Sequence, residues 1–280
     1  VFRTGINYQA AEATYLRASW GQGFRFPSMA ELFIRATQSG LEIFPNPSLK
    51  PESGWSTEFG IKQGLKFGKW LGHLDAALFL MRYNDMMEFS FGKWGEDLGL
   101  DNFGGRGFKS VNVGETQISG VELSITGQGK INDNLTINLL AGYTYVNPIP
   151  LNPDQVYESY QGTNILELYN NGEYLPPVEV SDVTYNNSSS DPSVLKYRYQ
   201  HIVKIDSELT YKKYSLGSSF RFNDFMKNID AIFTDRTINE GIGSGAVSYT
   251  HLRAHETPEH LRCRLVLGKK KRGGGGGGGG

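Results

Sequence analysis

Cysteine and histidine are scarce in this chain, and their positions limit the chemistry that it can perform. The sequence has one cysteine, Cys263, and five histidines, of which His251, His255 and His260 lie close to that cysteine. Residues 1–245 therefore hold neither a disulfide framework nor a Cys/His metal site. They also lack a nucleophile elbow, a phosphate-binding loop and a zinc signature. We expect no enzyme activity, no bound metal and no cofactor.

Long apolar runs are also missing. No stretch of about 18 consecutive apolar residues occurs, which excludes a membrane-spanning helix. The first residues do not show the basic and then apolar pattern of a signal peptide, so we do not expect Val1 to be the natural start of the protein. Helical periodicity is largely absent as well, which favours an all-β fold.

Residues 246–280 differ in character from the rest of the chain. Residues 247–257 back-translate to a nucleotide sequence that resembles a transposase adapter used in preparing sequencing libraries, and the lysine and glycine runs that follow resemble poly-A and poly-G read-through. The alternative is a genuine basic tail that binds nucleic acid or anionic lipid. We interpret 246–280 as a non-native, disordered tail and 1–245 as the folded part. Without the tail the chain is acidic, and we expect no nucleic-acid partner.

Segments in which apolar and polar residues alternate recur through residues 1–245. Phe59, Ile61, Leu65 and Phe67 alternate with small or polar residues, and the segment 135–145 alternates in the same way. This period of two is typical of strands with one apolar face. We expect about eight such strands, each long enough to cross a bilayer at a tilt.

The connections between these strands alternate between short and long. We place the short ones at 10–13, 68–72, 127–134 and 212–213, and the long ones at 23–53, 92–115 and 147–196. Outer-membrane barrels have short periplasmic turns and long extracellular loops, whereas a soluble β-sandwich has no reason to make every second connection this long. An apolar face toward lipid and a polar face toward a water-filled lumen also agree with an outer-membrane barrel. The pattern predicts a transmembrane antiparallel β-barrel with long extracellular loops.

The most specific motif lies at the first long connection. It runs from Arg17-Ala-Ser-Trp-Gly-Gln-Gly-Phe-Arg-Phe-Pro through Asn46-Pro-Ser-Leu-Lys-Pro-Glu52 to Glu58-Phe-Gly-Ile-Lys62. This combination resembles the C-terminal barrel of TonB-dependent outer-membrane receptors. Later segments, at 119–123, 201–213 and 225–233, resemble the branch common in Bacteroidetes. The residues that carry the resemblance are Gly23, Phe24, Arg25, Pro27, Glu31, Asn46, Pro47, Leu49, Pro51, Glu52, Glu58 and Gly60. From their charges we expect Arg25 to pair with Glu31 or Glu52, and we expect these roles to be structural.

The resemblance implies a barrel of roughly twenty-two strands around an N-terminal plug, powered by an inner-membrane TonB complex. It implies an outer-membrane location in a Gram-negative bacterium, contact with outer-membrane lipid, and an extracellular small-molecule or metal-chelate ligand. We find no plug, no TonB-contacting segment and no terminal strand that ends in an aromatic residue. We therefore expect a fragment of a receptor for scarce nutrients such as an iron chelate, haem, cobalamin or a glycan, which neither inserts stably nor transports by itself.

Two long connections contain the candidate ligand contacts. Residues 147–195 have no Lys or Arg but are rich in carboxylates and tyrosines, and residues 92–109 contain further aromatic and basic side chains. Aromatic faces with carboxylates suit a sugar or a cationic or metal-bearing ligand, although a solvated surface loop has the same composition. The candidates are Trp94, Arg106, Asp154, Tyr157, Glu158, Tyr160, Glu167, Tyr169 and Tyr174.

Two other functions remain open at this point. The first is a passive porin-like or adhesin barrel, and the second is a soluble β-rich binding module. An upstream plug separates the receptor from the passive barrel, because only an energised transporter needs one. A requirement for detergent separates both barrels from the soluble module.

Overall fold

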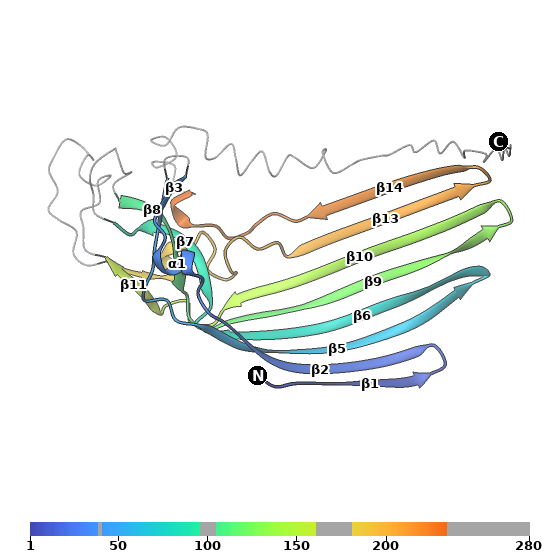
Figure 1. Ribbon diagram of the computed structural model, residues 1–280, viewed down its shortest axis with the longest axis horizontal. Helices are drawn as coiled ribbons and strands as arrows, with labels where there is room; N and C mark the ends of the chain where they lie inside the picture. Colours follow the sequence, from blue (N-terminus) through green and yellow to red (C-terminus); the bar gives the residue numbers. More distant parts are fainter. Residues whose placement is uncertain (39–40, 96–104, 161–180, 234–280) are drawn as a thin grey trace, which may run out of the picture.

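Eight long strands form one antiparallel sheet in the computed structural model (Figure 1). The structure describes residues 1–38, 41–95, 105–160 and 181–233. The strands are β1 (Arg3–Ala11), β2 (Thr14–Arg25), β5 (Glu52–Phe67), β6 (Lys69–Asn84), β9 (Thr116–Asn132), β10 (Leu135–Pro150), β13 (His201–Tyr211) and β14 (Tyr214–Asn223). Their order in the sheet is their order in the chain, with β1 and β14 at the two edges of an unclosed sheet. The prediction of an all-β partial barrel is confirmed.

Short turns and long connections lie at opposite ends of this sheet, as the sequence predicts (Figure 1). The four hairpins turn at residues 12–13, 68, 133–134 and 212–213. Gly68 and Lys212 have φ angles of 60° and 55°, the left-handed conformation that such tight turns require. Each long connection leaves the other end, so all three meet on the same side of the molecule.

Several predicted boundaries are wrong: β6 begins at Lys69, inside the predicted short connection 68–72, and the second long connection begins at residue 85 and not at 92. The segment 127–134 is not a turn, because β9 continues to Asn132 and pairs with β10 along its whole length. Alternation is hard to see here since glycines replace apolar residues. The Trp70 ring supplies the missing apolar surface: a Cβ added to Gly127 would lie 2.1 Å from its Cζ2 atom. Trp70 is consequently only 6% exposed.

The two faces of the sheet differ in polarity. Ile6, Ala18, Phe59, Leu78 and Val121 are register neighbours in five successive strands and make one apolar row. Phe59 and Leu78 are about 60% exposed, at 61% and 59%. Exposed apolar rows on a sheet of this length are expected where the neighbouring phase is lipid. No helix in the described part of the chain is long and apolar enough to span a bilayer.

The long connections, which were predicted as extracellular loops, contain regular secondary structure. They contain β3 (Ala36–Gln38), β4 (Leu41–Phe44), β7 (Met87–Lys93), β8 (Arg106–Asn112), β11 (Val156–Tyr160), β12 (Ser181–Thr184), α1 (Met29–Phe33) and α3 (Tyr185–Ser188). A second sheet has the order β3-β4-β8-β7, in which β4 and β8 are parallel, and β11 pairs with β12. We name the described residues of 26–51, 85–115, 151–200 and 224–233 the loop assembly.

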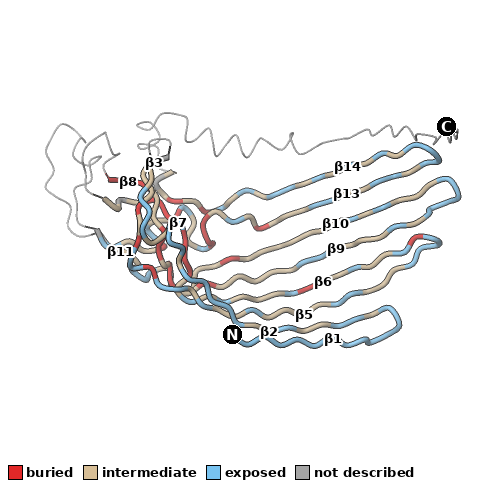
Figure 2. Tube along the Cα trace, in the orientation of Figure 1, coloured by how far each residue is buried: buried red, intermediate tan, exposed pale blue. Residues whose placement is uncertain are grey.

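The loop assembly holds the main apolar core of the described residues. Met86, Val111, Val113, Tyr185 and Leu195 form its buried cluster. Figure 2 shows buried residues gathered at this end, whereas the long strands are mainly intermediate or exposed. The sheet thus needs its surroundings to cover it, while the loop assembly is packed internally.

Candidate functional site

The family-like motif connects the end of the sheet to the loop assembly. Arg25 ends β2, and its guanidinium pairs with Glu31 of α1 and with Glu52 of β5, at 3.2 Å in each case. Glu52 also accepts the backbone N–H of Met87, which starts β7. Arg25 thus makes both of the ion pairs that its sequence position suggested, and the trio joins three strands and one helix.

Glu31 has a second role in this junction. Its carboxylate accepts the backbone N–H of Ser28, while the Ser28 hydroxyl accepts the N–H of Glu31, which is a capping box at the start of α1. Partial burial acts to raise the pKa of Glu31, but the hydrogen bonds from Ser28 and the pairing with Arg25 outweigh it and lower the pKa. Pro27 directly precedes the cap, so its fixed φ angle sets the entry of the helix.

The Asn46-Pro47 part of the motif holds two connections together. The Asn46 side chain is 5% exposed, donates to the Ser110 carbonyl of β8 at 2.9 Å and accepts from both the backbone and the hydroxyl of Ser48. Leu49, which follows in the same turn, is buried. Pro51 directly precedes β5. An Asn at this position therefore satisfies a buried carbonyl that belongs to another connection.

Glu58 and Gly60 lie on the polar face of the sheet. Arg17 lies opposite Gly60 in the register and pairs with Glu58 and with Asp75, both at 2.7 Å. A Cβ at Gly60 would lie 2.5 Å from the guanidinium carbon of Arg17. Glycine is therefore needed here to let the Arg17 side chain cross to the Asp75 carboxylate on β6.

The other two motif residues at the end of β2 make few specific contacts. Gly23 has open space around it, and the Phe24 ring packs edge-on against the Phe26 ring.

Two of the candidate ligand contacts come together through a lysine that was not among the candidates. Lys109 of β8 pairs with Glu158 at 2.7 Å and lies over the Trp94 ring, 5.2 Å from its centroid. The Trp94 ring nitrogen donates to the Gly107 carbonyl at 3.0 Å. Trp94 and Glu158 are thus adjacent parts of one cluster, although the charge of Glu158 is already neutralised. Arg106 starts the same strand.

Other candidates have structural surroundings. The Tyr157 hydroxyl hydrogen-bonds to Ser188 at 2.7 Å, its ring packs against the buried cluster, and burial raises its pKa to about 12. Asp154 accepts a hydrogen bond from Asn186. Tyr160 ends β11, but the structure does not describe its side chain. Glu167, Tyr169 and Tyr174 lie outside the described residues. Their role as ligand contacts stays a prediction.

The centre of the loop assembly is a buried ion pair that the sequence analysis did not find. Lys196 and Asp230 are 2.6 Å apart, and each side chain is 1% exposed. The Lys196 ammonium also donates to Ser90 and Ser188, both at 3.0 Å. The only sequence signal was a single lysine directly after a long basic-free segment. Asp230 lies in a stretch noted for its family resemblance alone.

Asp230 is the acceptor that links three parts of the chain. Its carboxylate accepts from the Ser90 hydroxyl and the Phe91 N–H of β7, each at 3.0 Å, and from the Tyr197 hydroxyl at 2.6 Å. Burial next to this carboxylate raises the pKa of Tyr197. With Lys196, four donors surround one carboxylate, so Asp230 joins β7 to residues 196 and 197.

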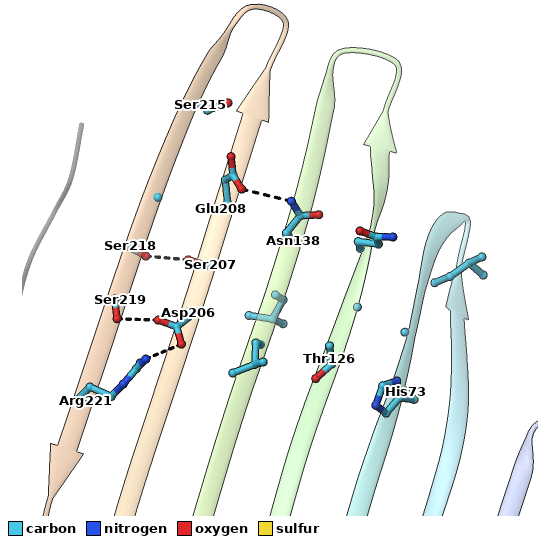
Figure 3. Close-up of a pocket in the computed structure, with 17 residues that line it drawn as sticks. His73, Thr126, Asn138, Asp206, Ser207, Glu208, Ser215, Ser218, Ser219 and Arg221 are labelled. Carbon is cyan, nitrogen blue, oxygen red and sulfur yellow. Dashed lines mark hydrogen bonds and ion pairs between the residues drawn. The ribbon is translucent and has the colours of Figure 1, made fainter. Parts of the chain in front are cut away.

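The concave polar face of the sheet has a separate groove of about 1370 Å³ near the turns (Figure 3). Asp206 lies in it and accepts from Arg221 and Ser219, at 2.7 Å and 2.6 Å, and Asn138 donates to Glu208 at 3.4 Å. His73 also lines it. None of the predicted ligand contacts reaches this groove, since all of those described belong to the loop assembly at the opposite end.

Neither histidine of the sheet has a metal-binding partner among the residues that the structure describes. His201 hydrogen-bonds to the Tyr143 hydroxyl at 2.9 Å and packs against the Tyr145 ring. Within the part of the chain that the structure describes, no group of three His, Cys, Asp or Glu side chains could hold a metal ion.

The fold and this junction define a class: a segment of an up-and-down transmembrane barrel whose long connections are organised at one end. The chain belongs to the family described as TonB dependent receptor-like, beta-barrel, which matches residues 1–233. This family consists of transport receptors and places the chain in the outer membrane of a Gram-negative bacterium. No curated protein sequence matches the chain.

Solved structures similar to this chain include three receptors or transporters. The copper transporter OprC is 18% identical over 78% of this chain and 25% of its own, with a TM-score of 0.45. The Serratia marcescens hemophore receptor HasR is 16% identical over 81% and 32%, with a TM-score of 0.45. The pyoverdine receptor FpvA of Pseudomonas aeruginosa is 14% identical over 81% and 27%, with a TM-score of 0.43. The chain thus spans only about a quarter to a third of their lengths.

Proposed function

We propose that this chain is part of a receptor for TonB-energised uptake of a scarce nutrient, such as an iron chelate, haem, cobalamin or a glycan. The observation that carries the proposal is the family match over residues 1–233. In this proposal the TonB complex acts through a plug that is not within these 280 residues, and the ligand arrives from outside the cell.

The loop assembly supports a receptor more than a passive pore. Its connections form a packed core with a buried ion pair, and a rigid support of this kind positions ligand-contacting side chains better than free loops do. We propose the Trp94–Lys109–Glu158 cluster as one ligand-contacting part. An aromatic face beside a charge pair suits a sugar ring or a planar chelate.

Uptake by the intact receptor, expressed from the source gene in an outer-membrane host, tests the proposal. Nutrient accumulation is measured with and without an uncoupler of the inner membrane. We expect accumulation that the uncoupler abolishes, whereas equal uptake in both conditions would identify a passive barrel. For the cluster, Trp94→Ala should weaken ligand binding, and Glu115→Gln, an exposed ion-pair change in the same connection, should not.

We also propose that the native folded part is 1–245 and that 246–280 is not native. The proposal rests on the adapter-like composition of that segment. Long-read sequencing of the source DNA tests it: genomic DNA that encodes this tail would refute it, and further strand-like sequence in its place would support it.

A further inference from the structure

Glu88 is a buried carboxyl group to which the Lys196 ammonium donates no hydrogen bond. It lies on β7, two residues before Ser90 and on the same face of the strand. It is 7% exposed, and neither of its carboxylate oxygens has a hydrogen bond of good geometry among the described residues, although the Tyr185 hydroxyl lies close enough to interact with it. A buried carboxylate without hydrogen bonds is unfavourable, so this position favours the neutral acid.

The Lys196 ammonium cannot donate a hydrogen bond to Glu88 without giving up one that it already makes. The three protons of the Lys196 ammonium are already donated to Ser90, Ser188 and Asp230. Lys196 and Asp230 also balance each other in charge. An ionised Glu88 would therefore add an uncompensated negative charge to a closed site, or would take a proton donor away from Asp230.

Charged and titratable groups from several segments that pack against β7 surround Glu88. The positive charges of Lys196 and Arg198 and the interaction with the Tyr185 hydroxyl oppose the effect of burial, and Asp230 adds to it. Burial is the larger effect and raises the pKa of Glu88 to about 7. The further groups on this side of β7 are Tyr157 of β11, Tyr185 of α3, Tyr197 before β13 and the Lys109–Glu158 pair.

β7 is the element that a charge on Glu88 would release. It is the edge strand of the second sheet, so β8 holds it on one side only. On the network side, Asp230 holds it through Ser90 and the Phe91 N–H. Loss of the Asp230 contacts would therefore separate β7 from the 224–233 segment, while β7 stays paired with β8 and Asn228 keeps its hydrogen bonds to residues 191 and 194.

We propose that Glu88 is a proton-controlled latch of the loop assembly. With the carboxyl group protonated the assembly is closed. With the group ionised, the carboxylate leaves its buried position or competes for Lys196, and the contact between β7 and Asp230 opens. This holds whichever ligand the receptor transports, and it makes the extracellular loops more open at alkaline pH than at mildly acidic pH.

The direction with pH follows from the raised pKa. The closed state binds the Glu88 proton more tightly than the open state, so its advantage is full below the ordinary glutamate pKa and is lost as pH rises through about 7. If opening restores an ordinary pKa, the opening equilibrium constant rises about tenfold from roughly pH 6 to roughly pH 8.5.

Hydrogen–deuterium exchange on the intact receptor in detergent micelles tests the latch. Peptides that contain the Phe91 and Tyr197 amides report on the network, and peptides from the β9–β10 hairpin provide the reference. The ratio of wild-type to Glu88→Gln exchange is compared at the two pH values, since the intrinsic pH dependence of exchange then cancels. We expect this ratio to rise about tenfold at the higher pH. Glu115→Gln, which changes an exposed pair with Arg82, is the matched control and should follow the wild type.

Two results would overturn the latch. One is a wild-type protection of these peptides that, corrected for intrinsic exchange, is the same at both pH values. The other is a Glu88→Gln protein that keeps the wild-type pH dependence, because the titrating group would then be elsewhere. The wild-type series alone decides the first point, so that part of the test does not depend on how well the variant folds.

Discussion

Replacing Lys196 with methionine should open the loop assembly while leaving the strand ladder intact. Lys196 and Asp230 are each 1% exposed, so the substitution leaves a carboxylate buried without its counter-ion. Removing one partner of a buried pair costs about 3–5 kcal/mol. Asp230 keeps its donors Ser90, Phe91 and Tyr197, which favours the lower end, about 3 kcal/mol.

This loss corresponds to roughly a hundredfold faster exchange of the Phe91 and Tyr197 amides when exchange occurs through local opening. Exchange in the β9–β10 hairpin should not change, because no atom of that ladder belongs to the network. The double variant Lys196→Met/Asp230→Asn should lose much less than the sum of the single variants, since the second change removes the stranded charge.

Two outcomes would refute this reasoning. Exchange of the two amides within a fewfold of wild type would mean that the pair does not hold β7 to the 224–233 segment. Additive losses in the double variant would mean that the two charges do not act on each other, despite the 2.6 Å between them.

Three further substitutions test separate contacts. Gly60→Ala should displace Arg17 and lower unfolding stability in urea by about 1 kcal/mol, since its ion pairs are partly exposed; in an Arg17→Met background the alanine should cost little. Gly127→Val should push the Trp70 ring off the sheet, which brominated detergent should report as increased quenching that is absent in a Trp70→Phe background. Asn46→Ala should leave a buried carbonyl without its side-chain donor at a cost of about 1–2 kcal/mol, measured as faster exchange in 105–115.

The strand pattern was predictable because the sheet has one apolar face and short turns. Period-two alternation at Phe59 to Phe67 needs only local sequence, and the turn at 212–213 follows directly from two such runs. The end of β9 was not predictable in the same way, because Trp70 from another strand covers Gly127. A side chain supplied by a neighbour leaves no signal in the strand that it covers.

The loop assembly was less predictable, for a similar reason. The motif residue Arg25 and its two carboxylates lie within 27 residues, so their pairing could be proposed from charge alone. Lys196 and Ser90 are 106 residues apart, and Glu88 becomes unusual only when the network excludes it. Contacts of this separation depend on the packing of several connections, which no local pattern encodes.

The parallel pairing of β4 with β8 has a mechanical consequence for the extracellular side. Two connections that leave different hairpins share backbone hydrogen bonds over residues 42–44 and 107–109. Asn46 adds a side-chain bond between the same two segments. A force that pulls on one connection is therefore transmitted to the other before either can yield. These two connections then respond to a load together, whereas each turn at the opposite end belongs to a single hairpin.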